Sequence, residues 1–121
     1  MAKKILAVDD SKTMRDMVTF TLSKAGFDVM EAADGQKALD VMRRTKFDLI
    51  ITDINMPIMD GITLIKNVRK LPAMKAKPIL MLTTEGLATK KEEGKAAGAT
   101  GWIIKPFDPD KLLQTIAKVL P

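Results

Sequence analysis

The chain has 121 residues, 46% of them hydrophobic, which suits one domain with one core. It carries 20 Lys and Arg against 15 Asp and Glu, a net charge of +5, but the basic residues are spread along the sequence, which argues against a nucleic-acid groove. The absence of Cys and His excludes disulfides, thiolate chemistry and the commonest general base. No apolar run approaches the roughly 18 residues of a membrane span, and Ile5–Val8 is too short for a signal peptide. We therefore expect a single cytoplasmic domain over residues 1–121, with no nucleic-acid or membrane partner.

Short apolar runs alternate with segments of helical periodicity in the first part of the chain. Lys3–Val8 predicts a strand, and two carboxylates follow it. A helix is expected from Ser11, and Gly26 is a typical residue for its end. Phe27–Glu31 predicts a second, weaker strand, after which Asp34-Gly35 opens a short helix with two arginines in its last turn.

The stretch Phe47–Asp53 is the one around which the other elements are arranged. It is a nearly continuous apolar run, as expected for a central parallel strand that is covered on both faces, and it ends in a carboxylate. The Met56-Pro57 turn cannot extend the strand, so Asp53 is expected at its carboxyl end. A third helix is expected over residues 62–71.

The last third of the chain continues the alternation. Ile79–Leu82 predicts a strand that ends at Thr83. Gly101–Ile104 predicts the fifth strand, which ends at Lys105. Asp108 is then expected to cap the last helix, which has a Pro in its first turn.

Two further predictions concern packing. The helix expected over residues 88–97 has few apolar residues and an interior glycine at Gly94, so we expect it to be marginal and mobile. Four methionines fall on apolar helix or strand faces and are expected to fill the core: Met14, Met17, Met42 and Met81.

Five strands that alternate with helices predict an α/β fold, a doubly wound five-stranded parallel sheet with helices on both faces. The carboxyl ends of such strands share the edge at which ligands bind. The residues expected at this edge are Asp9, Asp10, Asp53, Thr83 and Lys105. Each has another explanation when taken alone: Asp10 can cap a helix, Thr83 can be a β-branched core residue, and Lys105 can be a solvated charge. All four strand ends would need such an explanation at once.

Three carboxylates at one edge repel one another unless a cation lies among them, which indicates a hard divalent ion. Mg²⁺ fits because it prefers oxygen ligands and is usually held by one or two carboxylates. A lysine and a hydroxyl beside it suit a phosphoryl group. An EF-hand loop from Asp53 would need Gly and Glu where Ile58 and Leu64 stand, and no Walker or dinucleotide-binding glycine motif occurs.

With these residues in place, the chain resembles the response-regulator receiver domains, and most closely the CheY-like, single-domain chemotaxis members of that family. The resemblance covers essentially the whole chain, and its motifs are Val8-Asp9-Asp10-Ser11, Asp53-Ile54-Asn55-Met56-Pro57, Asp60-Gly61, Leu82-Thr83-Thr84-Glu85 and Lys105-Pro106-Phe107. The resemblance, rather than the pattern of elements, implies the flavodoxin-like (βα)5 fold with strand order 2-1-3-4-5, of which CheY is a standard example.

The resemblance implies that Asp53 is the phosphoryl acceptor, and that Mg²⁺ is bound by Asp9, Asp10, Asp53 and the backbone carbonyl of Asn55. The Asp53 carboxylate would be the nucleophile, and its acyl phosphate would later be hydrolysed. Such a protein catalyses only its own phosphorylation and dephosphorylation, so it is a signalling receiver rather than an enzyme.

Further roles are implied for residues around the acceptor. Thr83 and Lys105 would bind the phosphoryl oxygens, while Asn55 and Glu85 would tune the lifetime of the acyl phosphate. Movement of Thr83 toward the phosphoryl group would leave space for a turn of Trp102, which stands where the chemotaxis members usually have Tyr. This switch would remodel a surface that partners bind.

The expected function is therefore a stand-alone response regulator, phosphorylated by a sensor histidine kinase and acting on an output protein such as a flagellar motor switch component. A phosphatase is a further possible partner, and the regulator is expected to be a monomer. Two alternatives stay open. The chain could be a phosphate sink for the kinase, or a Mg²⁺-dependent phosphatase, although Asn55 stands where such enzymes generally carry a second Asp.

Overall fold

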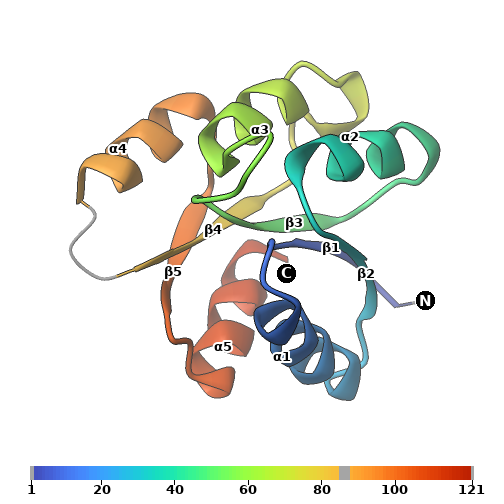
Figure 1. Ribbon diagram of the computed structural model, residues 1–121. Coiled ribbons are helices and arrows are strands. Elements are labelled where there is room, and N and C mark those ends of the chain that lie inside the picture. Colours follow the sequence, from blue (N-terminus) through green and yellow to red (C-terminus); the bar gives the residue numbers. More distant parts are fainter. Residues whose placement is uncertain (1, 85–87, 121) are drawn as a thin grey trace.

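The computed structural model describes residues 2–84 and 88–120, and within them it contains five strands, five α-helices and one short 3₁₀ helix (Figure 1). In chain order these are β1 (Lys4–Val8), α1 (Lys12–Lys24), β2 (Asp28–Ala32), α2 (Gly35–Arg44), β3 (Leu49–Asp53), α3 (Gly61–Val68), η1 (Pro72–Met74), β4 (Ile79–Thr84), α4 (Ala88–Ala97), β5 (Gly101–Lys105) and α5 (Pro109–Val119). The strands pair in parallel in the order β2-β1-β3-β4-β5. The predicted fold class and strand order are confirmed.

Helices cover both faces of the sheet (Figure 1). On one face α1 and α5 pack against the strands through Val18, Leu22, Leu112 and Ile116. On the other face lie α2, α3 and α4. The five residues of β3 are all buried, which explains the apolar sequence of this central strand. None of the helices in the described part of the chain is long and apolar enough to cross a membrane.

Local sequence signals explain where the helices begin. Side-chain oxygens of Ser11, Asp34, Asp60 and Asp108 each accept an N–H from the first turn of the helix that follows. Gly26 follows α1 with φ of 97°, a conformation that costs a glycine little. The predicted starts of α1, α2 and α5 are confirmed.

Some boundaries differ from the predictions by a few residues. β2 starts and ends one residue later than expected, and β3 starts at Leu49 instead of Phe47, although Phe47 is buried. The helix expected over residues 62–71 is divided into α3 and η1, and the latter has Pro72 in its first turn. The carboxyl ends of β1, β3 and β5, which position Asp9, Asp53 and Lys105, lie where the sequence predicts them.

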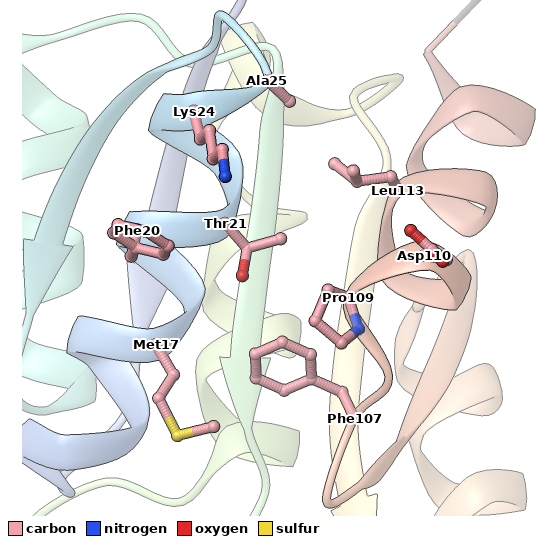
Figure 2. A pocket seen from close by; sticks show the side chains of 9 residues that line it. All are labelled: Met17, Phe20, Thr21, Lys24, Ala25, Phe107, Pro109, Asp110 and Leu113. Atoms are coloured by element: carbon pink, nitrogen blue, oxygen red, sulfur yellow. The ribbon is translucent and has the colours of Figure 1, made fainter.

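The prediction that Met17 fills the core is wrong. Met42 and Met81 are buried and Met14 is partly buried against the core, but Met17 is 46% exposed. Met17 lies one position before the inward-facing residue Val18, so its side chain is rotated by about 100° toward α5. There it lines an open groove of about 590 Å³ between α1 and α5 (Figure 2).

Gly94, inside α4, allows a close approach between α4 and the sheet. It is buried, and a Cβ at this position would lie 2.0 Å from Sδ of Met81 on β4. The glycine therefore has a packing reason that the sequence did not reveal. Arg69 also holds the end of α4, because its Nε and Nη2 donate to the carbonyl of Gly98 at 2.9 and 2.7 Å. That α4 is marginal and mobile stays a prediction.

Candidate functional site

The three predicted acidic residues meet at the carboxyl edge of the sheet. Asp9 and Asp10 follow β1, and Asp53 ends β3, the neighbouring strand. One carboxylate oxygen of each lies within 4.8 Å of the others. Asp9 and Asp53 are buried, with 2% and 7% exposed, whereas Asp10 is exposed to solvent. The site is thus open on one side.

The chain at Asp9 and Asp10 is held by the start of α1. Oδ1 of Asp9 accepts the N–H of Ser11 at 2.9 Å, and Oγ of Ser11 accepts the N–H of Met14 at 3.2 Å. Ser11, and not Asp10, is therefore the helix cap. The alternative explanation of Asp10 as a cap is wrong, and its carboxylate is available to the site.

Arg15 supports the same segment, and sequence reasoning missed it. Its Nη1 donates to the backbone carbonyl of Asp9 at 2.6 Å, and its Nε donates to Oε1 of Glu31 at 3.2 Å. The signal in the sequence was an arginine one turn into the helix that follows the acidic pair. Such a side chain can reach back to the strand ends.

Asp53 is fixed by the loop that follows β3. Its Oδ1 accepts the N–H of Ile54 at 2.8 Å. The loop then returns to the strand, since the N–H of Gly61 donates to the carbonyl of Ile54 at 2.8 Å. A Cβ at Gly61 would lie 2.2 Å from the carbonyl oxygen of Asp53, so only glycine allows this approach. The Asp-Gly pair was noted in the sequence, but this steric reason for the glycine was not.

Lys105 lies between the two buried carboxylates. Its Nζ is 2.9 Å from Oδ1 of Asp53 and 3.3 Å from Oδ2 of Asp9, and its side chain is only 18% exposed. The alternative explanation of Lys105 as a solvated surface charge is therefore wrong. Burial acts to lower the pKa of Lys105, but the hydrogen bonds and charges of Asp53 and Asp9 outweigh it, so the pKa is raised and the ammonium stays charged.

The residues present fit a hard divalent cation. Burial raises the pKa of Asp9 above its usual range, and the Asp53 carboxylate adds to this, while Ser11 and Lys105 offset it only in part. Oδ2 of Asp9 is buried and accepts no well-formed hydrogen bond from the described residues. Its ion pair with Lys105 supplies one positive charge against three carboxylates, and a divalent cation among them would relieve the remaining repulsion. Mg²⁺ accepts such an all-oxygen set.

Thr83 lies at the same edge, near the end of β4. It is buried, and β4 pairs with β3 so that Leu82 is in register with Asp53, one residue before Thr83. Side chains alternate along a strand, so Thr83 faces the same side as Met81, which packs in the core beneath α3 and α4. Thr83 therefore approaches the site from the α4 face of the sheet.

Trp102 shares that face with Thr83. It is in register with Met81 in the β4–β5 pairing, and its ring lies beneath the Nζ of Lys91 on α4, 5.3 Å from the ring centroid. The indole is 43% exposed. As expected from alternation, Trp102 and Lys105 lie on opposite faces of β5.

The structure says less about two further residues that the sequence singled out. Asn55, in the loop after Asp53, is exposed. Glu85 lies outside the described residues.

Comparison with known proteins gives a consistent result. Residues 5–117 match the family described as the response regulator receiver domain. The chain is 44% identical over 121 residues to the chemotaxis protein CheY1 of Helicobacter pylori, covering 97% of this chain and 96% of that one. It is 42% identical over 117 residues to the chemotaxis protein CheY-3 of Vibrio cholerae, covering 96% and 90%.

Solved structures extend the comparison. The chemotaxis protein CheY4 of Vibrio cholerae is similar with a TM-score of 0.96 and 52% identity, covering 99% of this chain and 100% of that one. The receiver domain of the sensor histidine kinase PA1611 of Pseudomonas aeruginosa, solved with a magnesium ion coordinated in its active site cleft, has a TM-score of 0.91 and 26% identity, covering 98% of each chain. The chain therefore belongs to the response regulator receiver domain family.

Proposed function

We propose that the chain is a stand-alone two-component response regulator that accepts a phosphoryl group on Asp53 from a histidine kinase. The arrangement around Asp53 carries this proposal. Its carboxylate ends the central strand, lies with the Asp9 and Asp10 oxygens inside 4.8 Å, and is 2.9 Å from the Lys105 ammonium. A nucleophile flanked by a fixed cation and by cation ligands is suited to phosphoryl transfer, which depends on positioning and charge neutralisation.

In the proposed reaction an Asp53 carboxylate oxygen attacks the phosphorus of a phosphohistidine in line. The new P–O bond forms as the P–N bond breaks, and the leaving imidazole takes a proton from solvent. Lys105 neutralises charge on the phosphoryl oxygens. The three carboxylates and the backbone carbonyl of Asn55 would hold Mg²⁺, which supplies further positive charge to those oxygens when bound. Water later attacks the phosphorus and releases inorganic phosphate, and Asn55 and Glu85 tune this step.

The same proposal assigns the readout to Thr83 and Trp102. Phosphorylation converts the Asp53 carboxylate, with a charge of about −1, into an acyl phosphate with a charge of about −2 and three strong acceptor oxygens. Thr83, buried on the neighbouring strand, then turns toward the phosphoryl oxygens. Trp102 responds on the next strand and alters the surface that it forms with α4.

The biological setting is proposed from the relatives. The chain spans 90–96% of the length of two chemotaxis proteins at 42–44% identity, which supports a single receiver domain over residues 1–121. We further propose that it acts in the cytoplasm as a monomer. We propose that its output passes through a bound protein such as a flagellar motor switch component, and that a phosphatase is a further partner. The alternative function, a phosphate sink for the kinase, would require no binding of an output protein.

The proposed acceptor can be tested with a small acyl phosphate and Mg²⁺. Mass spectrometry should find one added phosphoryl group on the wild-type protein, located at Asp53, and none on Asp53→Asn. Asp60→Asn is the matched control, because Asp60 caps α3 at the end of the same loop and Asn is an equally good cap. Undiminished labelling of Asp53→Asn would disprove the assignment. Turnover of added phosphomonoesters would instead support the phosphatase alternative.

A further inference from the structure

The loop between β3 and α3 contains a residue in a strained backbone conformation, and the packing of the loop does not require this residue type. Ile58 has φ of 69°, the only positive φ of a non-glycine residue in residues 2–84 and 88–120. The N–H of Met59 donates to the carbonyl of Pro57 at 2.7 Å, so Ile58 is the central residue of a γ-turn of the rare form with positive φ. For a β-branched residue this conformation is an outlier.

The turn itself has a structural purpose. Met56 before it and Met59 after it are both partly buried against the core, and Asp60 then caps α3. Reversing the chain between these anchors turns the side chain at position 58 outward, and Ile58 is 81% exposed. Glycine or asparagine would fit the same turn with less strain. The fold therefore explains the turn but not the isoleucine.

The position of the loop limits what Ile58 can contact. The loop is closed by the hydrogen bond between Gly61 and Ile54, and Gly61 lies against the carbonyl of Asp53. Ile58 is three residues from Gly61, so it lies within about 11 Å of it. A protein interface of standard size covers about 800 Å² on each partner, a disc of about 16 Å radius. A protein that docks centrally over Asp53 therefore covers Ile58.

We propose that Ile58 is a docking contact for the protein that donates the phosphoryl group, and that this donor carries an apolar patch beside its phosphohistidine. The inference rests on the proposed function. The donor is the occupant because it must bring phosphorus into bonding distance of Asp53, whereas an output protein needs only the surface around Trp102. Ile58 does not act as a lid over the acyl phosphate, since a side chain this exposed covers little of the protein.

The test compares two phosphoryl donors on the same variants. The protein donor is the autophosphorylated histidine kinase, among those of the same genome, that phosphorylates the wild-type protein fastest; the other donor is a small acyl phosphate with Mg²⁺. Ile58→Asn should slow transfer from the kinase at least tenfold at limiting kinase and leave labelling by the acyl phosphate within twofold of wild type. It should also raise the urea midpoint of unfolding, because asparagine tolerates the turn.

Two control variants identify the cause. Ile58→Leu keeps an apolar side chain and should retain most of the transfer from the kinase. Met30→Gln removes an exposed apolar side chain from β2, the edge strand, and should change neither reaction.

Each other outcome has a defined meaning. Wild-type transfer from the kinase to Ile58→Asn would overturn the proposal, and so would equal slowing with both donors, which would indicate a distorted acceptor. If the acyl phosphate labels Asp53 but no kinase phosphorylates the wild-type protein, the donor contact is wrong while the acceptor stands. If the acyl phosphate does not label the wild-type protein, the proposed function itself fails.

Discussion

The two faces of the sheet are built differently where they meet the carboxyl edge. On the α1 and α5 face, Asp9, Asp53 and Lys105 form a buried cluster held by charges at 2.9–3.3 Å. On the α4 face, Thr83 is buried but Trp102 is 43% exposed, and its described partner on α4 is the solvent-accessible Lys91. The chemical part of the site is thus fixed before any ligand binds, whereas the surface proposed to change shape is in contact with solvent.

The α4 face is nevertheless not loose throughout. The second half of α4 is held by the close approach of Gly94 to Met81 and by the hydrogen bonds from Arg69 to Gly98. Burial lowers the pKa of Arg69, because it disfavours the charged guanidinium. Hydrogen bonds from this guanidinium to several backbone carbonyls compensate for the lost contact with water. The α1 and α5 face is therefore held by charge. The α4 face is held by close packing and hydrogen bonds, and these lie near the C-terminal end of α4. The following variants test this contrast, from the largest expected effect to the smallest.

Lys105→Met tests the charge-fixed face. It leaves the Asp9 and Asp53 carboxylates without their cation, and the metal-free protein should lose about 2–3 kcal/mol of unfolding free energy, below the usual cost for a fully buried pair because Lys105 is partly exposed. Mg²⁺ at about 100 times its dissociation constant should restore about 2.7 kcal/mol. Urea unfolding with and without Mg²⁺ measures both. Lys105→Arg, which keeps the charge, is the control, and equal stability of Lys105→Met and wild type would contradict the charge-based account.

Gly94→Ala tests the shape-fixed face. If α4 were only marginal, alanine should stabilise it by about 1 kcal/mol. Because a Cβ would meet Sδ and Cε of the buried Met81, the flexible end of that side chain must move within the core, and we expect this overpacking to cancel the gain and leave a net loss of up to about 1 kcal/mol in urea unfolding. Ala96→Gly, on the exposed side of the same helix, should cost about 1 kcal/mol if the helix contributes to global stability. A gain for Gly94→Ala would show that α4 yields readily.

These two sites also show what sequence could and could not predict. The order of strands and helices and the residues at the strand ends follow from local signals: an apolar run, a capping Asp or Ser, a Pro. The role of Gly94 does not, because an interior glycine has the same sequence signal whether it weakens a helix or permits close packing. The prediction for Met17 was wrong for a related reason. Met17 faces α5, and its exposure depends on the distance between α1 and α5, which helical periodicity does not determine.

The site was predictable as a set of residues but not as a geometry. The convergence of Asp9, Asp53 and Lys105 follows from parallel strands that share one edge. The choice of Ser11 instead of Asp10 as the helix cap, and the return of Gly61 onto the Asp53 carbonyl, depend on backbone angles of one or two residues. Ser11 and Gly61 both belong to motifs noted in the sequence, but their structural roles follow only from the backbone geometry around them.

Asp10→Asn separates the contribution of Asp10, the exposed residue among the proposed metal ligands, from that of the buried cluster. Asp10 is exposed and makes no helix cap, so the metal-free protein should keep its stability or gain up to about 1 kcal/mol as repulsion among the carboxylates falls. Affinity for Mg²⁺ should fall at least about tenfold, because removing even groups that only orient a metal ligand has effects of that size. Calorimetric titration with Mg²⁺ beside urea unfolding distinguishes the two effects. A large loss of stability with normal Mg²⁺ affinity would favour a structural role.

The smallest expected effect is the optical response of Trp102, the only Trp in the chain and hence a reporter that needs no label. If phosphorylation draws Thr83 toward Asp53, the environment of the indole on the same face should change, and with it the fluorescence and the access of a soluble quencher. Mg²⁺ alone should alter this signal less than Mg²⁺ with a phosphoryl mimic.

Thr83→Ala removes the hydroxyl that would bind the phosphoryl oxygens while leaving the acceptor in place, so Asp53 should still be labelled but the Trp102 response should shrink. Thr19→Ala, a partly buried threonine on α1, serves as the control and should keep the full response. A full response in Thr83→Ala would show that the two faces communicate by another route, with the contact between Lys91 and the indole as the first place to look.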